Sequence, residues 1–138
     1  MAVFRPGEFT ITDKATEIAG LKKGDRVIDI GCGEGDTVAH LAEKFGFETE
    51  GIDMNLAMIS EAKSKHPGIN VKFGDGEFLD GYSSYTFDGV YMECVLSLIN
   101  LPDEALHEAY CVLKKGGKLI ISDMYEKDPD PKQLKAIK

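Results

Sequence analysis

The spacing of apolar residues alternates along the chain between a strand-like and a helix-like pattern, which predicts strands and helices in regular succession. Short runs rich in β-branched residues are typical of buried strands, and longer segments with one apolar face are typical of helices. The predicted strands cover residues 26–30, 47–52, 69–73, 86–92 and 118–123, and the predicted helices cover residues 12–21, 36–45, 55–65 and 101–113. Residues 114–117, Lys-Lys-Gly-Gly, are predicted to form a turn.

This succession predicts a single α/β domain. Strands separated by helices of this length pair in parallel through right-handed crossovers, so that helices cover both faces of the sheet. Ligands bind such sheets beyond the carboxyl ends of the strands, next to the first strand. The loops that follow the first four strands are therefore the candidate functional segments.

Composition narrows the partners that we expect. The 138 residues carry a formal net charge of −8, which disfavours nucleic acid and anionic membranes as partners. No apolar run approaches the ~20 residues of a membrane helix, and the N-terminus lacks the apolar stretch of a secretory signal. The three cysteines are too widely spaced for a disulfide framework or a zinc motif. We therefore expect a reduced, cytoplasmic protein without a metal site, in which His66 and His107 have no functional partner.

The loop after the first strand is rich in glycine. Residues 29–36 read Asp-Ile-Gly-Cys-Gly-Glu-Gly-Asp, and the glycines are Gly31, Gly33 and Gly35. Glycines at alternate positions let the backbone turn tightly and admit a ligand against bare main chain. The alternative is a tight turn without a ligand, but such a turn needs only one glycine.

The acids of this loop indicate the charge of its ligand. Gly31 and Gly33 fit the first two glycines of the dinucleotide fingerprint, but its third glycine falls on Asp36. Asp29 and Glu34 add two more carboxylates around the position of a pyrophosphate. At an effective dielectric near 20, like charges about 4–6 Å apart oppose each other by several kcal/mol. An anionic cofactor is therefore disfavoured, and one that carries a sulfonium and an α-ammonium is favoured.

Two further loops carry acids at the ends of strands. Asp53 follows Gly31 by 22 residues (53 − 31), and its carboxylate can accept both hydroxyls of a ribose, although such an acid is often only a helix N-cap. Asp75 can accept a hydrogen bond from an exocyclic amine while the next backbone N–H donates to a ring nitrogen. The alternative for Asp75-Gly76 is a simple turn.

Together the three loops resemble those of the class I S-adenosylmethionine (SAM)-dependent methyltransferases. The resemblance covers about residues 10–125, and it includes residues 87–90, Phe-Asp-Gly-Val, and residues 113–117, Leu-Lys-Lys-Gly-Gly. It is closest to the small-molecule branch of ubiquinone/menaquinone-type enzymes, also called methyltransferase-11-like. The resemblance implies a three-layer Rossmann-like α/β/α sandwich with strand order 3-2-1-4-5.

The resemblance also implies SAM as cofactor, S-adenosylhomocysteine (SAH) as product and a small-molecule methyl acceptor. The residues that it implies for cofactor binding are Asp29, Gly31, Cys32, Gly33, Gly35, Asp53, Met54, Asp75, Gly76, Glu77, Glu93 and Cys94. Glu93 and Cys94 end the fourth strand, which lies beside the methyl donor in the family. Their alternative roles are a solvated loop acid and a small packed side chain. No catalytic residue is assigned, because an acceptor that is a thiolate, an amine or a carbanion needs no general base.

The chain departs from the family after the fifth strand. Members usually continue with a helix and an antiparallel hairpin, which are expected to be missing here, where residues 126–138 form a tail and residues 1–9 an N-terminal arm. The apolar run Leu119-Ile120-Ile121 then lies on an edge strand, which favours a homodimer through that edge. The alternative functions are a non-catalytic SAM-binding module or fragment and a nicotinamide-dependent oxidoreductase.

Overall fold

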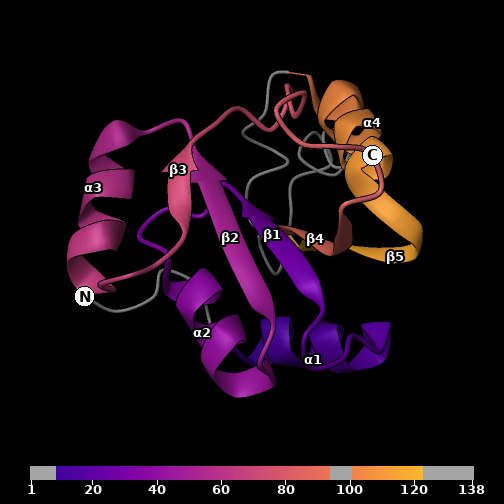
Figure 1. The fold of residues 1–138 in the computed structure, drawn as a ribbon, viewed down its shortest axis with the longest axis horizontal. Helices are drawn as coiled ribbons and strands as arrows, with labels where there is room; N and C mark the ends of the chain where they lie inside the picture. The colour runs from indigo at the N-terminus through magenta and orange to yellow at the C-terminus, as the bar shows by residue number, and fades with distance from the viewer. Residues whose placement is uncertain (1–8, 94–100, 123–138) are drawn as a thin grey trace, which may run out of the picture.

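The computed structural model describes residues 9–93 and 101–122 as a parallel five-stranded sheet with helices on both faces (Figure 1). The elements are α1 (Thr10–Ala19), β1 (Arg26–Ile30), α2 (Asp36–Phe45), β2 (Glu48–Asp53), α3 (Leu56–Lys65), β3 (Val71–Phe73), β4 (Phe87–Glu93), α4 (Pro102–Val112) and β5 (Leu113–Ser122). The strand order is β3-β2-β1-β4-β5 and every pair is parallel, which confirms the predicted architecture.

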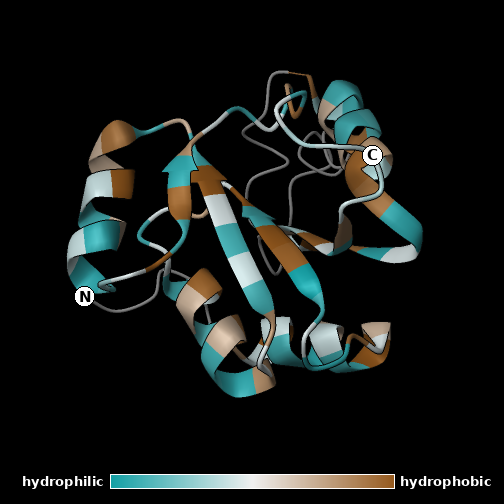
Figure 2. Cartoon of the chain, viewed as in Figure 1, coloured by the Kyte–Doolittle hydropathy of each residue, from teal (hydrophilic) through white to brown (hydrophobic). Residues whose placement is uncertain are grey.

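The two faces of the sheet bury separate apolar clusters. On one face, Val27 of β1 packs with Leu41 of α2 and with residues of α1, and α2 also packs on α3. On the other face, Ile28 packs with Ala105 and Ala109 of α4. Figure 2 shows hydrophilic and hydrophobic residues side by side along α2 and α3, as expected of helices with one face on a sheet. This double burial explains why the strands read as short continuous apolar runs.

Two strands end one residue later than the sequence predicts. Asp53 is the last residue of β2, and Glu93 is the last residue of β4. Both acids are therefore held by the sheet itself, at its carboxyl edge, instead of lying in the loops that follow. No helix in the described ranges combines the length and the apolar character that crossing a membrane requires.

The turn predicted over residues 114–117 is wrong, because these residues belong to β5. Phe87 pairs with Leu113 and Gly89 pairs with Lys118, so β5 carries an irregularity opposite the start of β4. Gly116 has φ +81°, and a Cβ on Gly117 would lie 2.8 Å from a carbonyl oxygen, so both positions suit glycine. The two glycines make a bulge within a strand, not a loop between two elements.

The apolar run on β5 is also less open than the edge position suggests. Ile120 is buried and packs with Val27 and Tyr91, whereas Ile121 on the opposite face is 43% exposed. The arm expected over residues 1–9 is described only at Phe9, and the tail expected over residues 126–138 lies outside the described residues. Cys94 lies outside them as well.

Candidate functional site

The glycine-rich loop after β1 curls over the end of β2. The backbone N–H groups of Gly31 and Cys32 donate to the carbonyl of Ile52, at 2.8 and 2.9 Å. The N–H of Gly33 donates to Asp53 Oδ2 at 2.9 Å, which joins the first loop to the second. The loop has φ +80° at Gly31, +54° at Gly33 and +80° at Gly35, a left-handed conformation that other residues adopt only with strain. The sequence spacing of the three glycines is therefore matched by the backbone.

Asp53 organises the turn at the end of β2. Its Oδ1 accepts from the backbone N–H of Asn55 at 2.8 Å, while its Oδ2 holds Gly33. The N-cap of α3 is Asn55, whose side chain accepts from Ala57 and Met58, so the alternative role of Asp53 as the helix cap is wrong. A carboxylate offers about four acceptor positions, and the two loop contacts leave Asp53 able to accept further hydrogen bonds from hydroxyl groups.

The loop after β3 crosses the ends of the two neighbouring strands. The N–H of Gly74 donates to the carbonyl of Asp53 at 3.1 Å, and a Cβ on Gly76 would lie 2.6 Å from Ile30 Cγ2. Asp75 does form a turn, because its Oδ1 accepts from the N–H of Glu77 at 2.9 Å. The structure therefore brings the loops of β1, β2 and β3 into contact.

Glu77 links this third loop to the start of α4. Its Oε1 accepts from the backbone N–H of Leu101 at 2.7 Å. Several large apolar side chains around these loops are more than half exposed, and they are Met54, Leu56, Phe73, Phe78 and Leu101. An apolar surface beside hydrogen-bonding carboxylates suits a ligand with both a flat ring and hydroxyl groups.

The acids of the glycine-rich loop are less isolated than the sequence suggests. Lys65 Nζ lies 3.3 Å from Glu34 Oε2 and 2.9 Å from Asp36 Oδ1, and His66 Nε2 lies 2.8 Å from the same Asp36 oxygen. His66 therefore has a partner that its sequence position did not suggest. Burial alone would raise the pKa of Asp36, but the hydrogen bonds from Lys65 and His66 outweigh it and hold that pKa below its usual value. Because Lys65 and His66 lie beside Glu34 and Asp36, the loop repels an anionic ligand less strongly than its sequence predicts.

Cys32 contributes its backbone to the loop and its side chain to the core. Gly51 on β2 makes room for it, because a Cβ there would lie 2.7 Å from Cys32 Cβ. Burial raises the pKa of the Cys32 thiol, and the carboxylates of Asp29 and Asp53 raise it further. The side chain remains a neutral thiol and is a poor nucleophile.

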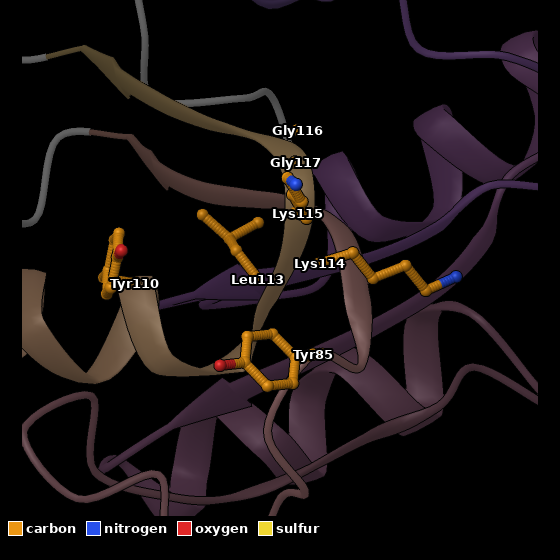
Figure 3. Close-up of a pocket in the computed structure, with 7 residues that line it drawn as sticks. All are labelled: Tyr85, Tyr110, Leu113, Lys114, Lys115, Gly116 and Gly117. Carbon is orange, nitrogen blue, oxygen red and sulfur yellow. The ribbon is translucent and has the colours of Figure 1, made fainter.

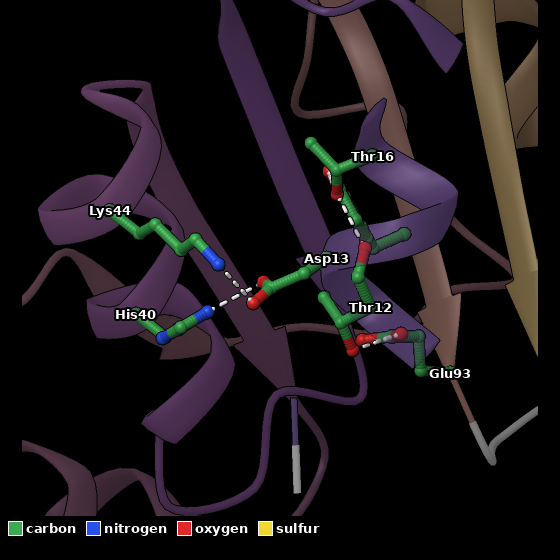
Figure 4. Close-up of polar contacts among 7 residues, drawn as sticks. Thr12, Asp13, Thr16, His40, Lys44 and Glu93 are labelled. Carbon is green, nitrogen blue, oxygen red and sulfur yellow. Dashed lines mark hydrogen bonds and ion pairs between the residues drawn. The ribbon is translucent and has the colours of Figure 1, made fainter. Parts of the chain in front are cut away.

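Glu93 is a buried acid, so its alternative role as a solvated loop acid is wrong. Its side chain is 5% exposed, and its Oε2 accepts from Thr12 Oγ1 at 2.6 Å (Figure 4). One turn further along α1, the hydroxyls of Thr16 and Tyr91 lie 2.6 Å apart. Thr12 and Thr16 are not among the residues that the sequence proposes for the site, although their four-residue spacing places them on one face of a helix. Asp29, on the neighbouring strand, is buried too.

A separate cavity of about 640 Å³ opens at the amino ends of β4 and β5 (Figure 3). Its lining comprises Tyr85, Tyr110, Leu113, Lys114, Lys115, Gly116 and Gly117. None of the residues that the sequence proposes for cofactor binding lines this cavity. The candidate site therefore rests on the three contacting loops at the carboxyl end, where the hydrogen-bonding groups converge, and not on the volume of this opening.

Comparisons with known proteins bear on the family and the fold of this chain. Residues 21–137 match a family described as a methyltransferase domain. The chain is 32% identical over 130 residues to phosphoethanolamine N-methyltransferase 3 of Arabidopsis thaliana, covering 91% of this chain and 26% of that protein. It is 31% identical over 107 residues to demethylmenaquinone methyltransferase of Renibacterium salmoninarum, covering 78% of this chain and 44% of that protein. The chain thus spans less than half the length of either relative.

A solved structure shows the same fold. The crystal structure of the [4+2]-cyclase SpnF matches with a TM-score of 0.81 and 24% identity, covering 92% of this chain and 48% of that one. At this level of identity the similarity extends to the architecture, the order of strands and the position of the helices.

Proposed function

This chain belongs to the family of SAM-dependent methyltransferase domains, and from that membership we propose that it transfers the methyl group of SAM to a small-molecule acceptor. The observation that carries the proposal is the contact between the first two loops, in which Gly33 donates to Asp53. It is supported by the third loop, where Gly76 crosses over Ile30. Donors and acceptors from three successive strands are thus available to one extended ligand.

Each of the three loops is assigned to one part of SAM. In the proposal, the backbone of Gly31 to Gly35 holds the methionyl part, and the carboxylate of Asp53 accepts the ribose hydroxyls. Asp75 accepts from the adenine amine, and the N–H of Gly76 donates to the ring. The remaining proposed contacts are those of Asp29, Cys32, Met54, Glu77, Glu93 and Cys94. The exposed side chains of Met54 and Phe73 would lose apolar surface to water on contact with the adenine, which favours binding.

The protein's own part in the reaction is positioning and the exclusion of water. SAM supplies an already activated methyl group on its sulfonium, so the site must hold donor and acceptor in line and keep water out. Cys32 does not accept the methyl group in this proposal, because its thiol is buried and its raised pKa keeps it neutral. In the proposal, the methyl group passes directly from the sulfonium of SAM to the bound acceptor.

Calorimetric titration tests the cofactor. We expect SAM and SAH to bind and NAD not to bind, since membership of the methyltransferase family argues against the alternative of a nicotinamide oxidoreductase. Transfer of a labelled methyl group to candidate amines, thiols and quinols then separates an enzyme from a SAM-binding module. Tight binding of NAD without a heat signal from SAM would contradict the proposal.

We also propose that two copies pair along β5, the outer strand of the described sheet. An exposed strand edge offers unpaired backbone groups to another chain. Light scattering should report a dimer, and Ile121→Lys should shift the equilibrium toward the monomer. Ile121 is the residue to change because Ile120 belongs to the core. A strictly monomeric protein at high concentration would contradict this proposal.

A further inference from the structure

We infer that Lys65, at the end of α3, is a positioning residue for the cofactor loop: it ties the outer side of the glycine-rich loop to α3 and sets the charge that the loop presents. The inference rests on the proposed function, because the loop is the part of the site that would hold the methionyl end of SAM. Neither the glycine pattern nor the acid after β2 points to this lysine.

The geometry shows how Lys65 spans the loop. Its ammonium reaches Glu34 at 3.3 Å and Asp36 at 2.9 Å, the two acids on either side of Gly35. Gly35 itself fits against Ala62 of α3 and against Ile69, which follows the helix, because a Cβ on Gly35 would lie 3.2 Å from Ala62 Cβ and 2.6 Å from Ile69 Cδ1. The outer side of the loop is therefore packed on α3 and ion-paired to it at the same place.

The inner side of the loop is held independently. There the N–H of Gly31 donates to the carbonyl of Ile52 and the N–H of Gly33 donates to Asp53. Glycine loses more conformational freedom on ordering than any other residue, so a loop with glycine at alternate positions needs contacts on both sides to keep one conformation. Lys65 supplies the outer contact, and Asp53 supplies the inner one.

The ion pairs persist at neutral pH. The hydrogen bond that Lys65 donates to the Asp36 carboxylate raises the pKa of Lys65, and the bond to Glu34 raises it further, so the ammonium stays protonated. All three side chains are shielded in part, with 25% of Lys65, 15% of Glu34 and 16% of Asp36 exposed. Such partly buried pairs are less screened by salt than pairs on the open surface.

The charge of Lys65 also bears on the choice between SAM and SAH. The sulfonium gives SAM a net charge of +1, whereas SAH is a neutral zwitterion. Removing the ammonium leaves Glu34 and Asp36 with one positive charge fewer beside them. The loop then becomes more negative, which favours the cation over the neutral product, while the loosened loop weakens both ligands.

The experiment compares Lys65→Met with the control Lys63→Met. Lys63 is an exposed residue on the same helix, and the structure shows no ion pair for it among the described residues. The dissociation constants of SAM and SAH are measured by calorimetry at low and high salt. For Lys65→Met we expect SAH to weaken about tenfold and SAM by less, so that the ratio of the two changes by about twofold or more at low salt. Lys65→Arg should restore both values, and Lys63→Met should change neither.

A purely structural role would weaken SAM and SAH equally, with no dependence of their ratio on salt, and that result would overturn the inference. Unchanged affinities in Lys65→Met would overturn it as well. Amide hydrogen exchange without ligand provides a readout that does not depend on the proposed function. Exchange at Gly33 and Gly35 should accelerate in Lys65→Met but not in Lys63→Met, with exchange at Val90 in the core unchanged.

These two measurements separate the possible failures. If wild-type protein binds neither SAM nor SAH, the proposed function fails, and the exchange data alone decide whether Lys65 holds the loop. If the wild type binds both ligands and the exchange at Gly33 and Gly35 is the same in all variants, the role of Lys65 is wrong and the proposed function stands.

Discussion

The two ends of the parallel sheet differ in how their glycines and charged side chains are used. At the carboxyl end, Gly35 has φ +80° and a Cβ on it would lie 2.6 Å from Ile69, while at the amino end Gly116 has φ +81° with no heavy atom within 4 Å of such a Cβ. A glycine with nearly the same positive φ is thus packed against neighbouring side chains at one end and free of such contacts at the other. A glycine that is both left-handed and packed marks a loop whose shape is fixed.

The two ends of the sheet also differ in their charged side chains and in the volume of their openings. The carboxyl end gathers acids that accept hydrogen bonds from neighbouring loops, as Asp53 does from Gly33. The amino end has a cavity of about 640 Å³ lined by tyrosines and lysines. Our proposal places the cofactor at the carboxyl end, because the hydrogen-bonded loops converge there, and not at the larger opening of the amino end.

The largest effect should come from filling the packed glycine. Gly35→Ala is expected to lower the free energy of unfolding by about 2–4 kcal/mol, because it combines left-handed strain with overpacking. Gly116→Ala should cost only the strain, about 1–2 kcal/mol. Chemical denaturation of the two variants measures both values. Equal losses would show that the two ends are not packed differently.

Asp53→Ala should weaken SAM by about 10- to 150-fold, equivalent to about 1.5–3 kcal/mol for hydrogen bonds to a charged group. The exposed acid Asp80 provides a control, and Asp80→Ala should leave the affinity unchanged. Calorimetry measures both variants, with circular dichroism to confirm the fold. Wild-type affinity in a folded Asp53→Ala protein would mean that this carboxylate serves only the backbone of its own turn.

Acid should loosen the glycine-rich loop through Asp36. Its folded pKa lies below the usual 3.8, so the ionised group stabilises the fold above that value and loses this effect as the pH falls through the folded pKa. Asp36→Asn should lower the free energy of unfolding at pH 7 by about 1 kcal/mol. The difference from wild type should close in acid, whereas Asp80→Asn should show no such trend. A difference that persists at low pH would argue against the ion pair with Lys65.

The smallest effect is expected at the amino end. Tyr110 is 77% exposed and lines the cavity there, so Tyr110→Ala should change the dissociation constant of SAM by less than about twofold. A tenfold loss of SAM affinity in this variant would indicate that the cofactor binds at the amino end of the sheet and not at the carboxyl end.

The sequence predicts the elements whose signals are local. The apolar runs locate the first four strands to within two residues, whereas β5 begins five residues earlier than predicted. The glycines around Gly33 together with Asp53 identify the loops that the structure brings into contact. Contacts between distant segments leave no such local signal. The bond from Thr12 to Glu93 joins residues 81 positions apart, and the pair of Lys65 with Asp36 depends on how α3 lies against α2.

The bulge in β5 illustrates a different difficulty. Two lysines followed by two glycines are typical of a turn, and the local sequence contains nothing that distinguishes a turn from a bulge. What decides is pairing with β4, where Phe87 meets Leu113 before the register shifts. That pairing is a property of the assembled sheet.

Amide hydrogen exchange with and without SAM tests most directly whether the carboxyl-end loops hold the cofactor. The account predicts that SAM slows exchange at Gly31, Gly33 and Gly76, and leaves Lys115 and Gly116 in the amino-end cavity unchanged. Slower exchange at Lys115 and Gly116, with none at the glycine-rich loop, would contradict it.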